Sequence, residues 1–332
     1  MGIVGQVVGT PGADVLLSSS DDDEITAYGG DDIIIGWGEA HAYLGIRDDG
    51  TDFIRGGSGS DTYVVPSWRY TDSDGIDRFP AIAVYAELGN GSVDYSEPGF
   101  SRDFLVSVEN ITTADGDEII AGSRGANIIS VGGGAYLVLA RGGHDTILGG
   151  VTSLADEPLT DVRGERLYGG AGDDTISSGG AYWHYQIQEY YAGAGAITDR
   201  LFGGKGNDHL IGGPGNVVMT GGPGADIFEA RADVFVQHSF GSFVAVDSTL
   251  KIRDFGGNDV IHFRMGVVDD YTDDPQSPDV GFDDLTIRER GGNTVVTYDY
   301  TFHTLNQMEA DVQFRMVIKD YVGLTAEDFV FL

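Results

Sequence analysis

A nine-residue repeat constrains the fold of this chain more than any other feature. The segment LFGGKGNDHLIGGPGNVVMTGGPGADIFEA contains three Gly-Gly-x-Gly blocks that begin nine residues apart, at Gly203, Gly212 and Gly221. One large apolar residue returns at the same phase after each block, at Leu210, Met219 and Phe228. A disordered linker has no reason to keep such a phase, so the spacing predicts short units that stack on their neighbours.

Related Gly-Asp turns recur along most of the chain. They begin at Gly9, Tyr28, Arg55, Thr112, Gly122, Arg141 and Tyr168. A short β-branched or aromatic run follows each turn, which predicts a strand of about three or four residues. We expect the apolar residues of these strands to face the core, among them Ile33, Ile35, Ile147, Ile176, Leu210 and Ile227.

The pattern Gly-Gly-x-Gly-x-Asp-x-apolar-x resembles the nonapeptide of RTX (repeats-in-toxin) proteins, which form calcium-binding parallel β-rolls. The best copies are Gly56–Tyr63, Gly169–Ile176, Gly203–Leu210 and Gly221–Phe228. The segment from Ala83 is similar to the irregular lead-in that precedes such repeats. The part between Leu250 and Leu332 is similar to the family's C-terminal cap and type I secretion signal. The resemblance covers nearly the whole chain.

The resemblance implies an all-β fold. We expect a right-handed parallel β-solenoid with inserted loops, followed by an antiparallel β cap. The expected divisions are an N-terminal extension over residues 1–8, a solenoid over 9–230 with an irregular section at about 66–113, and a cap with the secretion signal over 231–332.

The repeat has the chemistry of a calcium site. Glycine reaches positive φ at little steric cost, so a glycine-rich turn can direct successive carbonyl groups inward. Calcium takes 6–8 oxygen ligands, more than one such turn supplies, whereas two stacked turns can supply them. In RTX β-rolls consecutive nonapeptides alternate between two edges, which implies a coil of eighteen residues. Asp208 and Asp226 would then be ligands on one edge, whereas the intervening block carries Val217 in place of Asp and is expected to bind calcium poorly or not at all.

The same count assigns the other candidate ligands. We expect several calcium ions and no other cofactor, with ligands from Asp14, Asp32, Asp61, Asp117, Asp145, Gly170, Gly172, Asp174, Gly204, Gly206, Asp208, Gly222, Gly224 and Asp226. Long interruptions at 38–52, 150–166 and 180–200 fall on alternate half-coils, which predicts one edge of calcium turns and one edge of inserted loops. For Asp23, at repeat phase within an acidic run, calcium binding and a solvated patch both remain open.

Composition excludes several classes of function. Acidic residues outnumber basic ones 53 to 19, and the net charge of −34 argues against binding to nucleic acid or to an anionic membrane. Such a charge also predicts self-repulsion of the folded state unless cations bind. There is no cysteine, which excludes disulfides and thiol catalysis. The sequence shows neither a Sec signal peptide nor an apolar run long enough to span a bilayer.

No catalytic motif stands out. The chain has seven histidines but no His-Glu-x-x-His, and it has no Gly-x-Ser-x-Gly or P-loop motif. Enzymes that resemble this chain carry a catalytic domain ahead of the repeats, whereas this chain starts in the repeats. We therefore expect it not to be an enzyme, although an active site on the inserted loops stays open as an alternative.

The aromatic segment AYWHYQIQEYYA over 181–192 is the most unusual insertion. Its rings either cover an open side of the solenoid or form a contact surface for a sugar or a protein. In the second case the partner-binding residues would be Tyr182, Trp183, Tyr185 and Tyr190.

Together these features predict a secreted calcium-binding structural or adhesive protein of a Gram-negative bacterium, such as a surface-layer, filament or extracellular-matrix component. It would leave the cell through a type I ABC exporter and fold on calcium binding. Its expected partners are further copies of itself or a cell-surface glycan. The alternative is a carbohydrate-binding module or an accessory subunit of a polysaccharide-acting enzyme.

Overall fold

The computed structural model describes residues 5–19, 22–36, 51–65, 70–71, 77–78, 84–95, 102–114, 116–132, 134, 136–150, 164–179, 182–184, 189–191, 198–213, 215–231, 234–236, 243–244, 248–264, 267–269, 280–303 and 309–332. These residues form strands and two single 3-10 turns, with no α-helix among them. In this described part there is also no helix of the length and apolar character that crossing a membrane requires. The all-β prediction is therefore confirmed.

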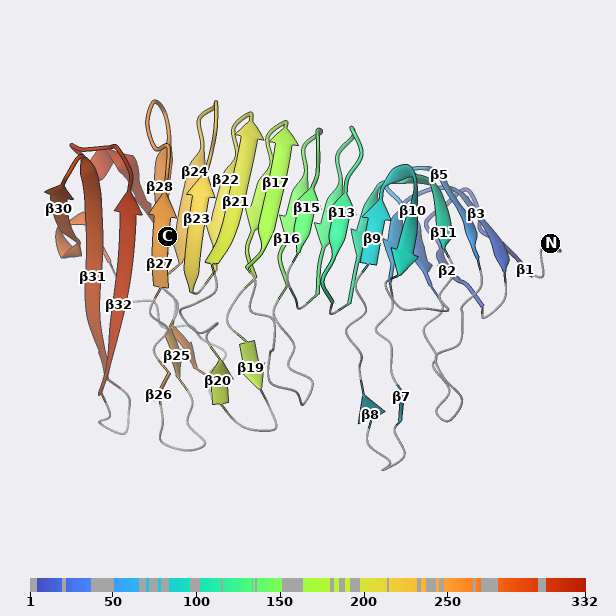
Figure 1. Ribbon diagram of the computed structural model, residues 1–332, viewed down its shortest axis with the longest axis horizontal. Coiled ribbons are helices and arrows are strands. Elements are labelled where there is room, and N and C mark those ends of the chain that lie inside the picture. The colour runs from blue at the N-terminus through green and yellow to red at the C-terminus, as the bar shows by residue number, and fades with distance from the viewer. Residues whose placement is uncertain are drawn as a thin grey trace. The chain divides into compact units, whose positions relative to one another are not determined.

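The chain divides into two compact units. The N-terminal unit comprises Met1–Asp161 with Leu167–Gly170, and the C-terminal unit comprises Val162–Arg166 with Ala171–Leu332. Strand β17 (Arg166–Ala171) contributes to both. Within each unit the strands stack side by side in two sheets, which we call the first and the second sheet (Figure 1).

In the N-terminal unit both sheets are mainly parallel. The first sheet has the order β1 (Gly5–Val8), β3 (Asp23–Gly29), β5 (Phe53–Ser58), β11 (Asp103–Val108), β10 (Gly89–Tyr95), β9 (Val84–Glu87), β13 (Ile119–Ala121), β15 (Leu137–Leu139). The second has the order β2 (Val15–Leu17), β4 (Ile33–Ile35), β6 (Thr62–Val64), β12 (Asn110–Thr112), β14 (Ile128–Ser130), β16 (Thr146–Leu148). Only β10 runs antiparallel to its neighbours in these sheets, within the expected irregular section. A small antiparallel pair lies outside them, formed by β7 (Tyr70–Thr71) and β8 (Asp77–Arg78).

The C-terminal unit continues the same plan. Its first sheet contains β21 (Thr198–Lys205), β23 (Asn216–Thr220), β27 (Ser248–Ile252), β32 (Glu309–Ile318), β31 (Asn293–His303), β30 (Thr286–Arg290). Its second contains β18 (Thr175–Ser177), β22 (His209–Gly212), β24 (Ile227–Arg231), β28 (Val260–Arg264), β33 (Phe329–Phe331). The remaining elements are β19 (Tyr182–His184), β20 (Glu189–Tyr191), β25 (Val234–Val236), β26 (Phe243–Val244), β29 (Val267–Asp269), and the 3-10 turns η1 (Phe282–Asp284), η2 (Ala326–Asp328).

The strand register has the predicted eighteen-residue coil wherever no loop is inserted. Leu210 pairs with Phe228, and Ile111 pairs with Ile129. An insertion lengthens the coil but keeps the pairing, because Ile33 pairs with Thr62, and Phe228 with Ile261. Equivalent residues of successive coils therefore stay aligned.

The core is a column of apolar side chains between the sheets. Leu210, Met219 and Phe228 are all fully buried, as their shared phase predicts. The expected inward orientation is wrong for Ile33, Ile35 and Ile227, because the side chains of a strand alternate between its faces and these residues lie next to the inward-facing position of β4 or β24. Ile34 and Phe228 occupy the core instead.

The parallel stacking extends past residue 230, where we expected the cap to begin. Strands β27 and β28 pair in parallel with β23 and β24, and β32 and β33 then pair in parallel with β27 and β28. Among the described residues after 230, the antiparallel pairing is that of the meander β30–β31–β32 and of the short pair β25–β26. At the other end, β1 pairs in parallel with β3, so residues 5–8 belong to the first coil rather than to a separate extension.

Candidate calcium-binding turns

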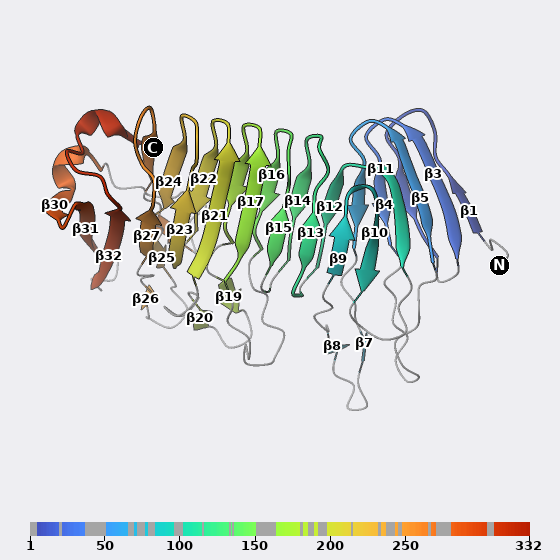
Figure 2. The same cartoon turned by 45° about the horizontal axis from the view of Figure 1, so that its top comes forward.

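Each coil has two different edges. At the first, which we call the turn edge, a first-sheet strand passes to a second-sheet strand through a short turn, as Figure 2 shows along its upper side. At the second, which we call the loop edge, a second-sheet strand passes back to a first-sheet strand. The connection there can be as short as residues 213–215, between β22 and β23, and it is much longer at residues 178–197, between β18 and β21, and at residues 265–285, between β28 and β30.

In the C-terminal unit, aspartates form a ladder along the turn edge. The backbone N–H of Asp174 donates to Oδ1 of Asp208 at 2.9 Å. That of Asp208 donates to Oδ1 of Asp226, and that of Asp226 to Oδ1 of Asp259, also at 2.9 Å each. The structure thus places Asp208 and Asp226 one coil apart on one edge. Asp259, which sequence reasoning missed, extends the ladder by one step.

The second carboxylate oxygen of several turn-edge aspartates lies against a glycine of the same turn. Among the described residues, Oδ2 is buried without a hydrogen-bond partner in Asp32, Asp61, Asp208 and Asp226. In the turn of Asp208 this oxygen lies over Gly203, where an added Cβ would be 2.2 Å from it. Burying such an oxygen is costly unless a donor or a cation satisfies it. The site therefore fits a cation that binds in the turn.

Main-chain carbonyl groups provide the other oxygens. Gly204, Gly206 and Gly222 have positive φ values of 116°, 130° and 105°. A Cβ on Gly222 would lie 2.0 Å from the carbonyl oxygen of Gly204, and one on Gly224 would lie 1.7 Å from that of Gly206. Stacked turns thus approach each other through backbone alone, and carboxylate with carbonyl oxygen is the donor set that calcium prefers.

The N-terminal unit has an equivalent ladder with two replacements. The backbone N–H of Asp14 donates to Asp32 at 2.8 Å, and that of Asp32 to Asp61 at 3.0 Å. The backbone N–H of Asp61 then donates to Oε2 of Glu109 at 3.0 Å, and the backbone N–H of Asn127 donates to Oδ1 of Asp145 at 2.7 Å. Asn127 is the sixth residue of the block at Gly122 and was detectable from repeat phase. Glu109 follows the irregular section, so no repeat marks it.

The remaining predicted ligands are less uniform. Gly170 and Gly172 have positive φ values of 114° and 137°, as a glycine turn requires. Oδ2 of Asp14 accepts hydrogen bonds from the backbone N–H and the hydroxyl of Thr10, so its own turn already occupies it. Asp117 is exposed and precedes β13, which places it on the loop edge rather than in the ladder.

The residues that precede the ladder aspartates form a second ladder of hydrogen bonds between coils. The residue before each ladder aspartate accepts a hydrogen bond from the next coil: Asp173 accepts from the backbone N–H of Asn207 at 2.7 Å, and Asn207 from that of Ala225 at 2.9 Å. In the last turn, Asp254 accepts from the backbone N–H groups of Gly221 and Gly222. These contacts fix the distance between successive turns.

The ladder carboxylates repel one another. Burial raises the pKa of Asp208 to about 7, and the charges of Asp174 and Asp226 add to the effect. Burial likewise raises the pKa of Asp226 to about 6, with Asp259 and Asp254 contributing. Closely spaced carboxylates gain most from a bound divalent cation, because the cation reverses the local electrostatic penalty.

The loop edge of the N-terminal unit also holds buried carboxylates, which sequence reasoning mostly missed. The backbone N–H of Asp23 donates to Asp52 at 3.0 Å, and that of Asp52 donates to Asp103 at 3.1 Å. Asp103 accepts hydrogen bonds from the hydroxyl groups of Tyr63 and Tyr95 at 2.7 and 3.0 Å. Asp23 is 2% exposed, so it is not part of a solvated patch. In the part of the chain that the structure describes, no turn of positive-φ glycines accompanies these carboxylates.

The predicted aromatic contact segment forms a hairpin. Strands β19 and β20 pair antiparallel, with Tyr182 opposite Tyr191 and Trp183 opposite Tyr190. Tyr185 lies outside the described residues.

The comparison with protein families identifies the repeats. Residues 8–40, 48–63, 112–147, 163–181 and 193–233 match the family "RTX calcium-binding nonapeptide repeat (4 copies)". These segments are RTX calcium-binding repeats. RTX repeats bind Ca²⁺ in multiple copies and indicate a secreted calcium-binding protein. The matched segments include most of the turn-edge aspartates, but neither Glu109 nor Asp259.

Among solved structures, the chain is similar to the extracellular lipase LipA from Serratia marcescens. The sequence identity is 15% and the TM-score is 0.24, and the match covers 99% of this chain and 40% of the lipase. The chain thus spans less than half the length of that protein. No curated protein matches the chain.

Proposed function

We propose that this protein is a calcium-stabilised structural or adhesive protein that assembles outside the cell, as a component of a surface layer, filament or extracellular matrix. The observation that carries the proposal is the apolar outer surface of the N-terminal unit. Calcium would fold the coils, and this surface would then join copies of the chain.

Both sheets of the N-terminal unit expose large apolar side chains on their outer faces. On the second sheet these are Val15, Leu17, Ile33, Ile128 and Leu148. On the first sheet they are Phe53, Tyr85, Phe104, Val106, Ile119 and Leu139. Rows of exposed apolar residues along a sheet favour association, because contact with a second surface removes them from water.

The C-terminal unit differs. Among its described residues, the exposed large apolar side chains are Val322, Val330 and Leu332, all outside β18, β21, β22, β23, β24, β27 and β28. The repeat itself therefore does not demand apolar outer faces. Their restriction to one unit supports a role in contact.

The assembly test is a measurement of mass against calcium and protein concentration, with imaging of the particles. We expect calcium-dependent oligomers, and we expect Phe53→Ser/Ile33→Ser to reduce them while leaving calcium-dependent folding intact. The matched control is Val322→Ser/Leu332→Ser, which removes two exposed apolar residues elsewhere. A protein that stays monomeric in calcium at all concentrations contradicts the assembly proposal.

Export before folding is the second part of the proposal. Extracellular calcium modules bind with Kd on the order of 10⁻⁴–10⁻³ M, so the chain would stay unfolded in the low calcium of the cytosol. The tail LTAEDFVFL would be the signal that a type I ABC exporter of a Gram-negative bacterium reads. In the folded chain this tail contains β33, which pairs with β28, and Phe329 is buried, so the tail is accessible mainly before folding.

The export test compares the secreted fraction of the full chain with that of a chain lacking residues 326–332. We expect the shortened chain to remain in the cell. Gly222→Ala, which impairs the turns but keeps the tail, is the control and should still be exported. Equal secretion of the shortened chain contradicts this part of the proposal.

The alternative of a carbohydrate-binding module has one supporting observation. The rings of Phe53 and Phe104 stack with centroids 4.9 Å apart and planes 12° apart, and both are exposed on the first sheet. Sugar rings stack on flat aromatic surfaces of this kind. Glycan retention by a monomer, lost in Phe53→Ala/Phe104→Ala, would favour this alternative over assembly.

The β19–β20 hairpin is a second proposed contact for the same partner, through Tyr182, Trp183 and Tyr190 together with Tyr185. The variant Trp183→Ala/Tyr190→Ala replaces two residues that are paired in the backbone register of β19 and β20. If self-association and glycan retention both match the parent, the hairpin is not a contact site.

A further inference from the structure

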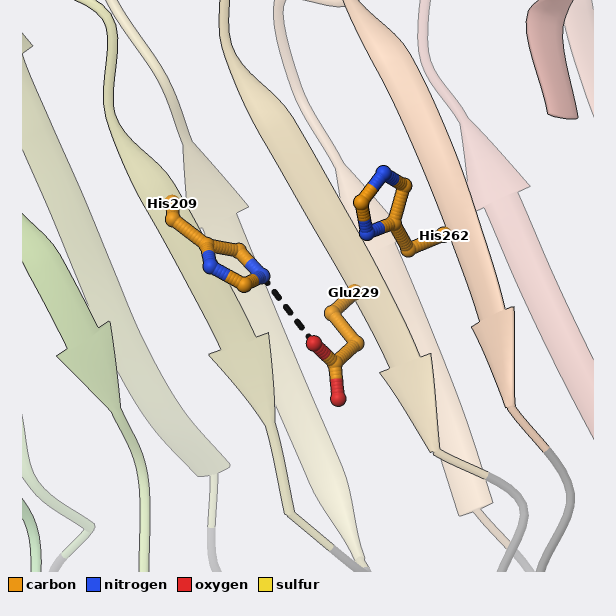
Figure 3. Close-up of side chains that lie close together, drawn as sticks. All are labelled: His209, Glu229 and His262. Carbon is orange, nitrogen blue, oxygen red and sulfur yellow. Dashed lines mark hydrogen bonds and ion pairs between the residues drawn. The ribbon is translucent and has the colours of Figure 1, made fainter. Parts of the chain in front are cut away.

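Three side chains with metal-binding groups converge on the second sheet of the C-terminal unit, away from the turn edge. His209 lies on β22, Glu229 on β24 and His262 on β28, and Figure 3 shows them on adjacent strands. The strands are parallel, and the register places Glu229 directly opposite His262. His209 pairs with Ile227, two residues before Glu229, so it approaches Glu229 diagonally.

All three face away from the core. Their strand neighbours Leu210, Phe228 and Ile261 are fully buried between the sheets. Because successive side chains of a strand point to opposite faces, His209, Glu229 and His262 share the outer face. Three ligand-bearing residues on one face of neighbouring strands form a rigid arrangement that needs no loop to close.

The side-chain atoms are close enough to share one ion. Nε2 of His209 lies 3.0 Å from Oε2 of Glu229. One nitrogen or oxygen from each residue lies within 4.8 Å of the others. Zinc takes nitrogen ligands at about 2.0–2.1 Å and carboxylate oxygen at about 2.0–2.2 Å, so ligand atoms around it lie roughly 3–3.5 Å apart. A small side-chain rotation brings the third atom to that spacing.

Glu229 is held in place for this role. It is 5% exposed although it lies on the outer face. Its other oxygen, Oε1, accepts a hydrogen bond from Nε of Arg231 at 2.7 Å. A partner that fixes the second oxygen of a ligating carboxylate is a recurrent feature of metal sites. Arg231 therefore leaves Oε2 directed at the histidines.

A hydrogen-bonded cluster without metal accounts for only part of this arrangement. His209 and Arg231 are sufficient to satisfy the Glu229 carboxylate. Within the described residues, His262 makes no side-chain hydrogen bond, and its ring contacts His209 edge-on with centroids 5.8 Å apart. A structural ion pair does not require His262 at this position, whereas a three-ligand metal site does.

We propose that His209, Glu229 and His262 bind one divalent transition-metal ion of the zinc class. Two imidazole nitrogens and one carboxylate oxygen suit zinc, cobalt or nickel, whereas calcium prefers an all-oxygen site. This site is therefore chemically distinct from the calcium turns. Three protein ligands leave a fourth position for water.

A metal ion at this site would stabilise the fold at a second place, in addition to the calcium-binding turns. The connection from β24 to β28 contains β25, β26 and β27, so the coil between Glu229 and His262 is an interrupted one. A metal that bridges β22, β24 and β28 would hold these strands in register on the sheet face, independently of the turn edge.

The test uses the full chain saturated with calcium, so that the carboxylate turns are already occupied. Zinc is titrated by calorimetry, and cobalt by its visible absorption, which reports nitrogen and oxygen ligation directly. We expect one high-affinity zinc ion per chain and a higher melting temperature in zinc. In His262→Ala the zinc affinity should fall at least tenfold, while the Glu229 pair with His209 and Arg231 remains.

His144→Ala is the matched control, because His144 is an exposed histidine outside the cluster. It should leave zinc binding unchanged. The calcium-dependent circular-dichroism spectrum verifies that each variant folds, and His262→Gln replaces His262→Ala if the latter does not. Zinc binding of equal affinity in the folded His262 variant, or no stoichiometric zinc binding by the parent chain, overturns the proposal.

Discussion

The two edges of the coils both contain buried carboxylates, but the groups around these carboxylates differ. On both, a buried carboxylate accepts a backbone N–H from the adjacent coil, as Asp226 does on the turn edge and Asp52 on the loop edge. On the turn edge the carboxylate lies against a glycine of its own turn, and successive turns approach each other through glycine carbonyl groups. On the loop edge, tyrosine hydroxyl groups donate to Asp103.

This difference predicts where calcium matters. On the turn edge, Oδ2 of Asp208 and Oδ2 of Asp226 are buried without a donor among the described residues, and glycine carbonyl groups of adjacent turns lie close together there. On the loop edge, Oδ2 of Asp52 is also buried without a hydrogen-bond partner among the described residues, but the oxygens of its neighbour Asp103 accept hydrogen bonds from protein groups. We therefore expect the turn edge to depend on a cation more strongly than the loop edge does. It also explains why insertions collect on the loop edge, since a longer connection there removes no oxygen from the calcium turns.

Removal of calcium tests the comparison with the largest expected effect. The turn-edge carboxylates then lose their partner and the net charge of −34 is unscreened, so we expect loss of cooperative folding. The measurement is far-ultraviolet circular dichroism with excess chelator, followed by readdition of calcium. A native β spectrum that persists in chelator contradicts the dependence of the turn edge on calcium.

The second prediction sets one edge against the other by an isosteric change. Asp208→Asn keeps the Oδ1 acceptor but removes the charge in a calcium turn. We expect it to lower calcium stoichiometry and, at free calcium one hundred times the Kd of the lost site, to cost about 2.7 kcal/mol of stability. Isothermal calorimetry and thermal unfolding check both values.

Asp52→Asn is the matched change on the loop edge. Burial raises the pKa of Asp52 to about 7, with the charges of Asp103 and Asp23 adding to the effect, so removal of its charge relieves repulsion. We expect unchanged calcium stoichiometry and no loss of stability.

A double variant on the turn edge tests whether adjacent turns share an ion. The stability lost in Asp208→Asn/Asp226→Asn should be less than the sum of the losses in the two single variants, because both aspartates would bind the same ion. Loss of different ions by the two variants would contradict the stacking.

The third prediction concerns the glycines. Gly222 has a φ of 105°, and the Cβ that Gly222→Ala adds would lie 2.0 Å from the carbonyl oxygen of Gly204. The control is Gly257→Ala. Gly257 also has a positive φ, 63°, but no atom lies within 4 Å of the added Cβ. The control should lose only the roughly 1–2 kcal/mol of left-handed backbone strain, and Gly222→Ala about 3 kcal/mol or more. Equal losses in thermal unfolding would show that close approach is not what the turn requires.

Repeat phase was sufficient to predict the parts of the molecule that repeat. The buried positions of Leu210, Met219 and Phe228 follow from the nine-residue spacing, and the resemblance to RTX β-rolls added the eighteen-residue coil and with it the pairing of Asp208 with Asp226. The outward orientation of Ile227 was missed, because an apolar residue beside the core position looks the same in sequence as one that faces inward.

Contacts that insertions bring together could not be predicted. Asp52 and Asp103 lie 51 residues apart in the chain, and the irregular section between them has no repeat phase. Glu109 replaces aspartate in the ladder at the end of the same section. His262 meets Glu229 only because the sheet continues past an insertion whose length the repeat does not determine.

The last and smallest expected effect is the pH dependence of folding. Its direction with and without calcium distinguishes the two edges. A carboxyl group whose pKa is raised on folding stabilises the fold at pH below its unfolded value of about 3.9, and this contribution is lost as pH rises through the folded pKa. The folded pKa values are about 7 for Asp208 and Asp52 and about 6 for Asp226. In chelator, β structure should therefore increase as the pH falls from about 8 to 5.

With calcium the direction reverses, because protons compete with the ion for the turn-edge carboxylates. The calcium concentration at the folding midpoint should rise as the pH falls over the same window. Asp52→Asn should weaken the pH response in chelator and leave the calcium response unchanged, since its carboxylate belongs to the loop edge. Asp208→Asn should weaken both. If Asp52→Asn shifts the calcium midpoint as much as Asp208→Asn does, the loop edge binds calcium too and the two edges are chemically equivalent.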